Sequence, residues 1–252
     1  MTCDEYKEKL NQIYREHYTG GKCPFYDQCF ASAKNTPKFT FDYAAKVGRE
    51  YGKTGFPKIL IVGKESKNHR AEVGTTTPSI HPEKGGADND HYRKTLYTLA
   101  LLLAESIPKS FSKEDLEEYE ELLQKFCLTN YFKCAVSGGE KSCYRGLPHT
   151  KAMKSNCYHL LEKEIDVLEP DIVIIQGKFT PKEFWSVYEN GERVAGNKTK
   201  EDDTISAYRH KNKKGKEFYI LYSYHPGCFR AWGGELLNDL KSIIASIPCK
   251  KG

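Results

Sequence analysis

The chain of 252 residues lacks an uninterrupted apolar run of about 18 residues, the length that a membrane-spanning helix requires. Its first ten residues are polar and partly acidic, without the apolar segment of a secretory signal peptide, so we expect a cytoplasmic protein. No internal repeat or linker-like segment stands out, which predicts one domain over residues 1–252. The net charge of +5 permits a polyanionic partner without requiring one.

The apolar residues of the chain form several short runs. They cover residues 59–62, 127–132, 171–176 and 218–224. Runs of this length that are rich in β-branched and aromatic side chains predict buried strands. Apolar residues at helical spacing predict helices over residues 4–17, 90–107, 149–168 and 232–247, with a further short helix over 41–51. Strands that alternate with helices predict a three-layer α/β/α sandwich around a mainly parallel, four-stranded sheet, with a charged insertion at residues 190–216.

The first apolar run ends in a sharp change to polar residues, Gly63-Lys64-Glu65-Ser66. Ligands of open α/β sheets bind just beyond the carboxyl ends of the strands, so a glycine turn that carries a carboxylate is a candidate active site. The alternative for this motif alone is a solvated turn without function. His225 follows the fourth run in a His-Pro-Gly turn, and a parallel sheet would bring it to the same edge.

Nine cysteines are many for a chain without an apparent export signal: Cys3, Cys23, Cys29, Cys127, Cys134, Cys143, Cys157, Cys228 and Cys249. Disulfides are the less expected use in this setting, and metal or cluster ligation is favoured for cysteines that lie in loops, such as the expected loop over residues 23–29. Cys127 lies inside a predicted strand and fits a small buried apolar residue instead.

Four pieces in order resemble the uracil-DNA glycosylase superfamily: VGKES at 62–66, LTNYFKC at 128–134, the block at 157–177, and YHPG at 224–227. The resemblance is closest to the branch that carries an iron–sulfur cluster, and it extends from about residue 23 to residue 244. It implies an enzyme that flips uracil or another modified base out of DNA and hydrolyses its N-glycosidic bond. The first motif lacks the proline and second glycine of the cluster-bearing branch, which leaves the excised base open.

The resemblance implies catalytic roles for two residues. Glu65 occupies the position of the residue that orients water or stabilises the sugar cation. His225 occupies the position of the histidine that stabilises the departing base through a hydrogen bond. A lone His-Pro at the end of a strand is otherwise compatible with a simple turn.

The implied base pocket contains Gly63 and Asn130. An amide offers both a donor and an acceptor, so Asn130 can read the edge of a pyrimidine. The alternative is an asparagine that binds backbone groups at the end of a strand. The aromatic residue that the family stacks on the base has no clear match, and His81 or Tyr92 could take its place.

Contacts to DNA are expected around the two catalytic motifs. Phe229 could act as a wedge and Arg230 as a phosphate contact, although Phe229 is equally compatible with packing under the last helix. Lys64 and Lys67 flank the first motif and could bind backbone phosphates. Charged runs are usually solvated, so the cations of the insertion are weaker candidates. These are Arg209, Lys211, Lys213, Lys214 and Lys216.

The resemblance also implies a [4Fe–4S] cluster held by Cys23, Cys29, Cys134 and Cys157. Cys134 and Cys157 match family positions, whereas the first pair is more widely spaced here than in the family. Cys143 competes for one position, and a structural zinc ion is the alternative to the cluster. The expected protein is a monomer that binds DNA and no membrane. Two other hypotheses stay open, a non-catalytic nucleic-acid-binding member of the fold and an unrelated zinc-stabilised module.

Overall fold

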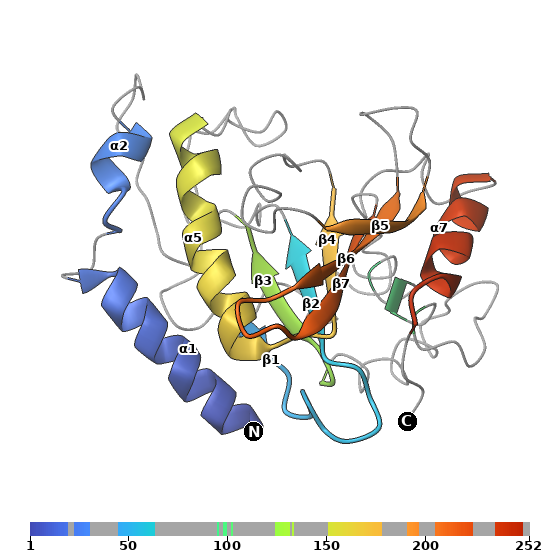
Figure 1. The fold of residues 1–252 in the computed structure, drawn as a ribbon. Coiled ribbons are helices and arrows are strands. Elements are labelled where there is room, and N and C mark those ends of the chain that lie inside the picture. Colours follow the sequence, from blue (N-terminus) through green and yellow to red (C-terminus); the bar gives the residue numbers. More distant parts are fainter. Residues whose placement is uncertain are drawn as a thin grey trace, which may run out of the picture.

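The computed structural model describes residues 1–19, 23–30, 45–63, 95, 98, 99, 102, 124–131, 133, 151–177, 191–196, 205–223 and 235–248. A sheet forms the middle layer, with α1 (Cys3–His17) and α5 (Lys151–Leu168) on one face and α7 (Glu235–Ala245) on the other (Figure 1). The short helix α2 (Tyr26–Phe30) packs against α5. The predicted α/β class with helices on both faces is therefore confirmed.

Within the described residues the sheet has seven strands in the order β1-β3-β2-β4-β7-β6-β5. They are β1 (Lys46–Val47), β2 (Ile59–Gly63), β3 (Cys127–Asn130), β4 (Ile172–Gln176), β5 (Glu192–Gly196), β6 (Ser206–Lys211) and β7 (Glu217–Ser223). The central strands β3, β2, β4 and β7 run parallel, and β1, β5 and β6 join them antiparallel. The prediction of a mainly parallel sheet of four strands is wrong, because three further strands extend the expected four into a mixed sheet.

The three additional strands lack the signal that predicted the others. β1 has only two residues, too few for any pattern of alternation. β5 reads ERVAG and β6 reads SAYRHK, so charged and polar residues interrupt the apolar ones. Both strands lie in the segment that the sequence marked as a charged insertion. They form because antiparallel pairing needs only a short connection, which lets β6 and β5 continue the sheet from β7.

Two local predictions near the N-terminus need correction. The helix expected over residues 41–51 is wrong for residues 45–51, which form β1 and turns. The reason lies at Gly48, where an added Cβ would lie 2.3 Å from the Gln124 carbonyl oxygen, so the backbone itself packs against the segment before β3. The loop expected over residues 23–29 contains α2, which places Cys29 on a helix.

The longer helices begin and end close to the predicted residues. Thr2 caps α1, and its capping box with Glu5 satisfies backbone donors at both residues. α5 covers 151–168 where 149–168 was expected, and α7 covers 235–245 where 232–247 was expected. Within the described residues, no helix combines the length and the apolar character needed to cross a membrane.

β2 shows how the core divides between the two faces of the sheet. Leu60 and Val62 belong to the cluster that α1 and α5 cover, whereas Ile59 and Ile61 belong to a second cluster with residues of α7. All four side chains are at most 1% exposed, as expected for a parallel strand with a layer on each face. The helix predicted over residues 90–107 lies mostly outside the described residues, but Leu99 is buried in the second cluster.

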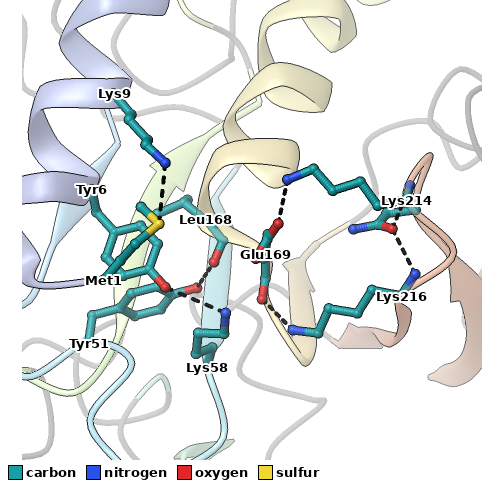
Figure 2. A network of polar contacts seen from close by, with 10 residues as sticks. Met1, Tyr6, Lys9, Tyr51, Lys58, Leu168, Glu169, Lys214 and Lys216 are labelled. Carbon is teal, nitrogen blue, oxygen red and sulfur yellow. Dashed lines mark hydrogen bonds and ion pairs between the residues drawn. The ribbon is translucent and has the colours of Figure 1, made fainter.

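The turn between β6 and β7 is tied to the end of α5 (Figure 2). Lys214 Nζ lies 2.5 Å from Glu169 Oε1, and Lys216 Nζ donates to the Glu169 carbonyl oxygen at 2.6 Å. Glu169 has φ 45°, a left-handed conformation that a non-glycine residue adopts only with support from its surroundings. Lys213 Nζ adds an ion pair with Glu162 Oε1 at 2.6 Å.

The contacts with the end of α5 hold Lys213, Lys214 and Lys216 of the insertion at one edge of the sheet. β7 begins at Glu217, directly after the turn, so the turn lies at the amino-terminal edge of the parallel strands. Ligands of such sheets bind at the opposite edge. Arg209 is also paired with Glu192, and Lys211 with Glu217. The cations of the insertion are therefore poor candidates for the phosphate contacts considered above.

Candidate functional site

The carboxyl ends of the four parallel strands meet at one edge of the sheet. Gly63 at the end of β2 is in register with Asn130 at the end of β3, and Gln176 at the end of β4 with Ser223 at the end of β7. Glu65 and His225 lie outside the described residues, as do Lys64, Lys67, His81, Tyr92, Phe229 and Arg230. Glu65 nevertheless follows the end of β2 by two residues, and His225 follows the end of β7 by two residues. The chain therefore leaves both strands at this edge of the sheet, and β4 lies between the two strands.

Gly63 and Asn130 are in direct contact. The Tyr131 N–H donates to the Gly63 carbonyl oxygen at 2.8 Å, which holds the ends of β2 and β3 together. A Cβ built on Gly63 would lie 2.8 Å from Asn130 Oδ1, and its next neighbour would be 3.9 Å away. The amide of Asn130 therefore lies over Gly63, in space that any larger residue would fill. Glycine is needed here for close approach, and the two predicted base-pocket residues come together.

Sequence reasoning missed a polar contact at the same edge. Gln176 is the last residue of an otherwise apolar strand, and its Nε2 donates to Thr95 Oγ1 at 2.8 Å. Both side chains are buried, at 3% and 6% exposure. Burying a side-chain amide costs free energy unless the amide is hydrogen-bonded. The bond to Gln176 therefore holds Thr95 against the end of β4. The glutamine at the end of the apolar run IVIIQ was the available signal.

Three of the four predicted cluster ligands lie in the described part of the chain. Cys23 precedes α2 and Cys29 lies on α2. Cys157 lies on α5 beside Asn156, whose amide contacts the Cys29 sulfur. Burial raises the pKa of the Cys157 thiol to about 12, and the sulfurs of Cys29 and Cys23 act in the same direction. Cys134 and Cys143 lie outside the described residues.

Each of these three sulfurs accepts a hydrogen bond from a nitrogen. The Phe25 backbone N–H donates to Cys23, and Asn156 Nδ2 donates to Cys29 Sγ at 3.5 Å. The Lys133 backbone N–H donates to Cys157. Hydrogen bonds of this kind stabilise the deprotonated sulfur, which is the form that ligates metals and clusters.

The three described cysteines are the residues that would contribute to a metal or cluster site here. In the described ranges, no group of three or more His, Cys, Asp and Glu side chains is spaced to hold one ion. A [4Fe–4S] cluster carries one thiolate on each of four irons, so its ligands stand farther apart than those of zinc.

His17 borders this group of cysteines. Its Nε2 lies 3.4 Å from Cys23 Sγ, and its ring packs edge-on against Tyr18 at 4.8 Å between centroids. Burial lowers the pKa of His17 to about 4, so the imidazole is neutral at physiological pH. Phe25, the residue before α2, stacks on His159 of α5 with 5.5 Å between the ring centroids. Aromatic rings and two imidazoles thus border these cysteines.

A buried ion pair lies behind the end of β3. Lys133 Nζ is 2.7 Å and 2.6 Å from the two carboxylate oxygens of Glu164, and these side chains are 2% and 0% exposed. Thr129 donates its hydroxyl to Glu164 Oε2 at 2.9 Å, and Tyr14 donates to Glu164 Oε1 at 2.6 Å. Burial lowers the pKa of Lys133, whereas the Glu164 carboxylate acts in the opposite direction.

Sequence reasoning missed this pair although both members carried a signal. Glu164 falls between Leu160 and Leu168 at a spacing of four residues, which puts a carboxylate on the apolar face of a helix. Such a residue is buried only with a partner. Lys133 lies within the second motif, LTNYFKC at 128–134. The network joins α1, β3 and α5, the elements next to both the cysteines and Asn130.

The comparison with known proteins agrees with this geometry. The sequence profile of the uracil DNA glycosylase superfamily matches residues 50–241, which is most of the chain. The match includes the motifs at 62–66 and 224–227. No curated protein matches the chain. The matched range contains β2, β3, β4 and β7, the strands whose carboxyl ends form the candidate site. The chain therefore belongs to the uracil DNA glycosylase superfamily.

Proposed function

We propose that the protein is a DNA glycosylase that flips uracil or another modified base out of DNA and hydrolyses its N-glycosidic bond. Members of this superfamily are generally DNA glycosylases, so activity on DNA is the expected starting point. The contact between Gly63 and the Asn130 amide is the observation that supports the proposal best. It puts a side chain able to read a base at the edge from which Glu65 and His225 follow.

The proposed chemistry breaks the bond between C1′ of the sugar and a ring nitrogen of the base. The electron pair of this bond leaves with the base, and the water oxygen bonds to C1′. Glu65 orients the water and stabilises the positive sugar. His225 donates a hydrogen bond to the base oxygen on which negative charge develops. The water proton finally neutralises the base, and Asn130 selects the base by its edge.

An excision assay over a panel of bases tests this function. Oligonucleotides with uracil, a deaminated purine or an enlarged pyrimidine, each single- and double-stranded, are incubated with protein and probed for abasic sites. We expect abasic sites on at least one substrate. Retained DNA binding without abasic sites on any of them would favour the alternative of a non-catalytic binding protein.

Gly63→Ala should change base selection with little effect on stability. Among the described residues, the new methyl group would meet only the Asn130 amide at short range, so that amide must move. Losing one hydrogen bond to the base corresponds to about a tenfold lower kcat/KM for the preferred substrate. The control is a double-mutant cycle with Asn130→Ala, in which Gly63→Ala should add no further loss. Additive losses would show that Gly63 acts on something other than Asn130.

Binding to DNA should depend steeply on salt through Lys64 and Lys67. Each phosphate contact contributes about 0.9 to the slope of log K against log salt concentration. Lys64→Gln/Lys67→Gln should therefore lower the slope by up to about 2 and weaken binding to all sequences alike. Lys213→Gln/Lys214→Gln is the matched control, because these lysines pair with carboxylates at the opposite edge. Equal slopes in both variants would exclude the first pair from phosphate contacts.

We also propose that Cys23, Cys29, Cys134 and Cys157 hold a structural [4Fe–4S] cluster. The packing of α2 against α5 and the N–H donors on the sulfurs support it. A cluster at this position would tie α2 to α5 and to the segment after β3. Zinc is the alternative, and the absorption spectrum separates the two because only the cluster is coloured.

Cys157→Ala should lose iron and stability together. A metal site that exists only in the folded chain contributes its binding free energy to folding. Cys127→Ala is the matched control, because Cys127 is fully buried inside β3 and serves as a core residue. Iron per chain and the thermal midpoint are measured for both variants. A full iron complement in Cys157→Ala would shift that ligand position to Cys143.

A further inference from the structure

The last residues of the four parallel strands form one row across the sheet, which we call the edge row. It consists of Asn130, Gly63, Gln176 and Ser223 on the neighbouring strands β3, β2, β4 and β7. The pairing of β2 with β3 and of β4 with β7 extends to these residues, and the pairing of β2 with β4 extends to the residues directly before them. The four residues are therefore neighbours at the carboxyl edge.

The edge row faces one side of the sheet. Successive side chains of a strand point to opposite faces. Three of the residues directly before the edge row, Val62, Ile175 and Tyr222, belong to the core cluster that α1 and α5 cover. The fourth, Thr129, donates to Glu164 of α5. The edge row therefore faces the other layer, which contains α7 (Figure 1).

A buried polar contact replaces apolar packing where this other layer reaches the edge row. Thr95, Thr98, Leu99 and Leu102 are helical and buried, at the spacing of one helix face. The two leucines belong to the apolar cluster, whereas Thr95 accepts a hydrogen bond from Gln176. Replacing both partners of a buried hydrogen bond by apolar groups of the same shape can be nearly neutral for stability. Stability alone therefore does not require an amide at this position.

We propose that Gln176, held by Thr95, reads a hydrogen-bonding group on the side of the flipped base that faces away from Asn130. This inference rests on the glycosylase function proposed above. Gln176 and Asn130 are two strands apart, which puts their Cα atoms about 10 Å from each other, close enough for one base to contact both side chains. Gly63 lies between them and has no side chain to separate them.

The amide of Gln176 has the chemistry for such a contact. One N–H is used on Thr95, and a glutamine amide also carries a second N–H and a carbonyl oxygen. The side chain is 3% exposed, so it can meet one polar atom of a base and cannot stack on a ring. Gln176 also lies on the strand between those that lead to Glu65 and His225. Its expected role is specificity, not bond cleavage.

The proposed contact favours bases that carry a polar group on this side. With Asn130 on the Watson–Crick edge, the far side of uracil has only C5–H and C6–H. Two kinds of base offer a polar group there: a pyrimidine with a hydroxymethyl group on C5, and a deaminated purine through N7. One hydrogen bond corresponds to about a tenfold difference in kcat/KM. We therefore expect a preference of that size over an analogue that lacks the group.

The experiment compares kcat/KM for matched bases in one oligonucleotide. 5-Hydroxymethyluracil is compared with thymine, and hypoxanthine with 7-deazahypoxanthine, so each pair differs in one polar group. We expect the polar member of at least one pair to be preferred, and the pair that shows the preference separates a pyrimidine from a purine substrate. Equal values in both pairs, or excision of uracil and none of these four bases, would overturn the inference.

Gln176→Met tests whether the preference depends on this amide. The substitution keeps the length of the side chain and removes its hydrogen-bonding groups, so the preference should disappear. Ile174→Val is the matched control, because Ile174 lies two residues earlier on the same strand and face and loses only a buried methyl group. This control should keep the preference. A preference that survives Gln176→Met would overturn the inference.

A second variant keeps the test decisive if Gln176→Met does not fold. Thr95→Val removes the hydroxyl that holds the amide and retains the shape of the side chain. We expect it to reduce the same preference, and an unchanged preference would contradict the inference. Absence of excision of every base, uracil included, would instead refute the proposed glycosylase function, so the two failures are distinguishable.

Discussion

Replacing Glu65 by Gln, or His225 by Ala, is expected to slow single-turnover base excision by about a hundred- to a thousandfold. Both residues act on charge that exists only as the glycosidic bond breaks, so their loss should leave DNA affinity little changed. β2 and β7 end at the same edge of the sheet, two residues before Glu65 and His225 respectively. Single-turnover kinetics and binding are measured on the same duplex.

Glu217→Gln provides the matched control for the loss of a carboxylate. Glu217 begins β7, so it lies at the end of the strand opposite to the candidate site, where it pairs with Lys211. This variant should excise at the parental rate. If Glu65→Gln also excises at the parental rate, water activation must be assigned to another carboxylate. Asp88 and Asp90, which lie in the polar segment after the first motif, are then the residues to replace.

Lys133→Met should be among the most destabilising single substitutions in the chain, with a loss of about 3–5 kcal/mol in the free energy of unfolding. The change leaves the carboxylate of Glu164 buried at 0% exposure without its cation. Thr129 and Tyr14 cannot replace that cation, because each offers Glu164 one neutral hydrogen bond. Urea denaturation measures the loss.

The double variant Lys133→Met/Glu164→Leu should recover most of that stability, because no charge is left buried. Glu162→Gln is the comparison, because it removes the partner of the exposed Lys213, and pairs with an exposed member are worth about 1 kcal/mol or less. A Lys133→Met variant within about 1 kcal/mol of the parent would contradict the account of a buried, strongly coupled pair.

The parallel part of the fold was predictable because its strands are buried on both faces. Ile59–Gly63 and Ile172–Gln176 read as apolar runs, and each carries helices above and below. β1 and β5 had no such signal, since one is very short and the other is half exposed and charged. Their place depends on pairing with neighbours that a single sequence does not reveal.

Only the residues of the candidate site that lie in recognisable motifs were predictable. Gly63 and Asn130 follow apolar strands, and parallel strands bring their ends together, so their contact could be expected. Gln176 and Glu164 also lie on buried elements, but their partners Thr95 and Lys133 are distant in sequence. A polar residue on an apolar face signals that a partner exists without saying which residue it is.

Release of the free base is the most direct test of the central claim that this protein hydrolyses N-glycosidic bonds in DNA. Duplexes that carry each candidate base are incubated with parent protein, and the released base and the abasic strand are both quantified by mass spectrometry. The account predicts equal amounts of the two products for at least one base, and their loss with Glu65→Gln/His225→Ala. No released base from any duplex that the protein binds would contradict it.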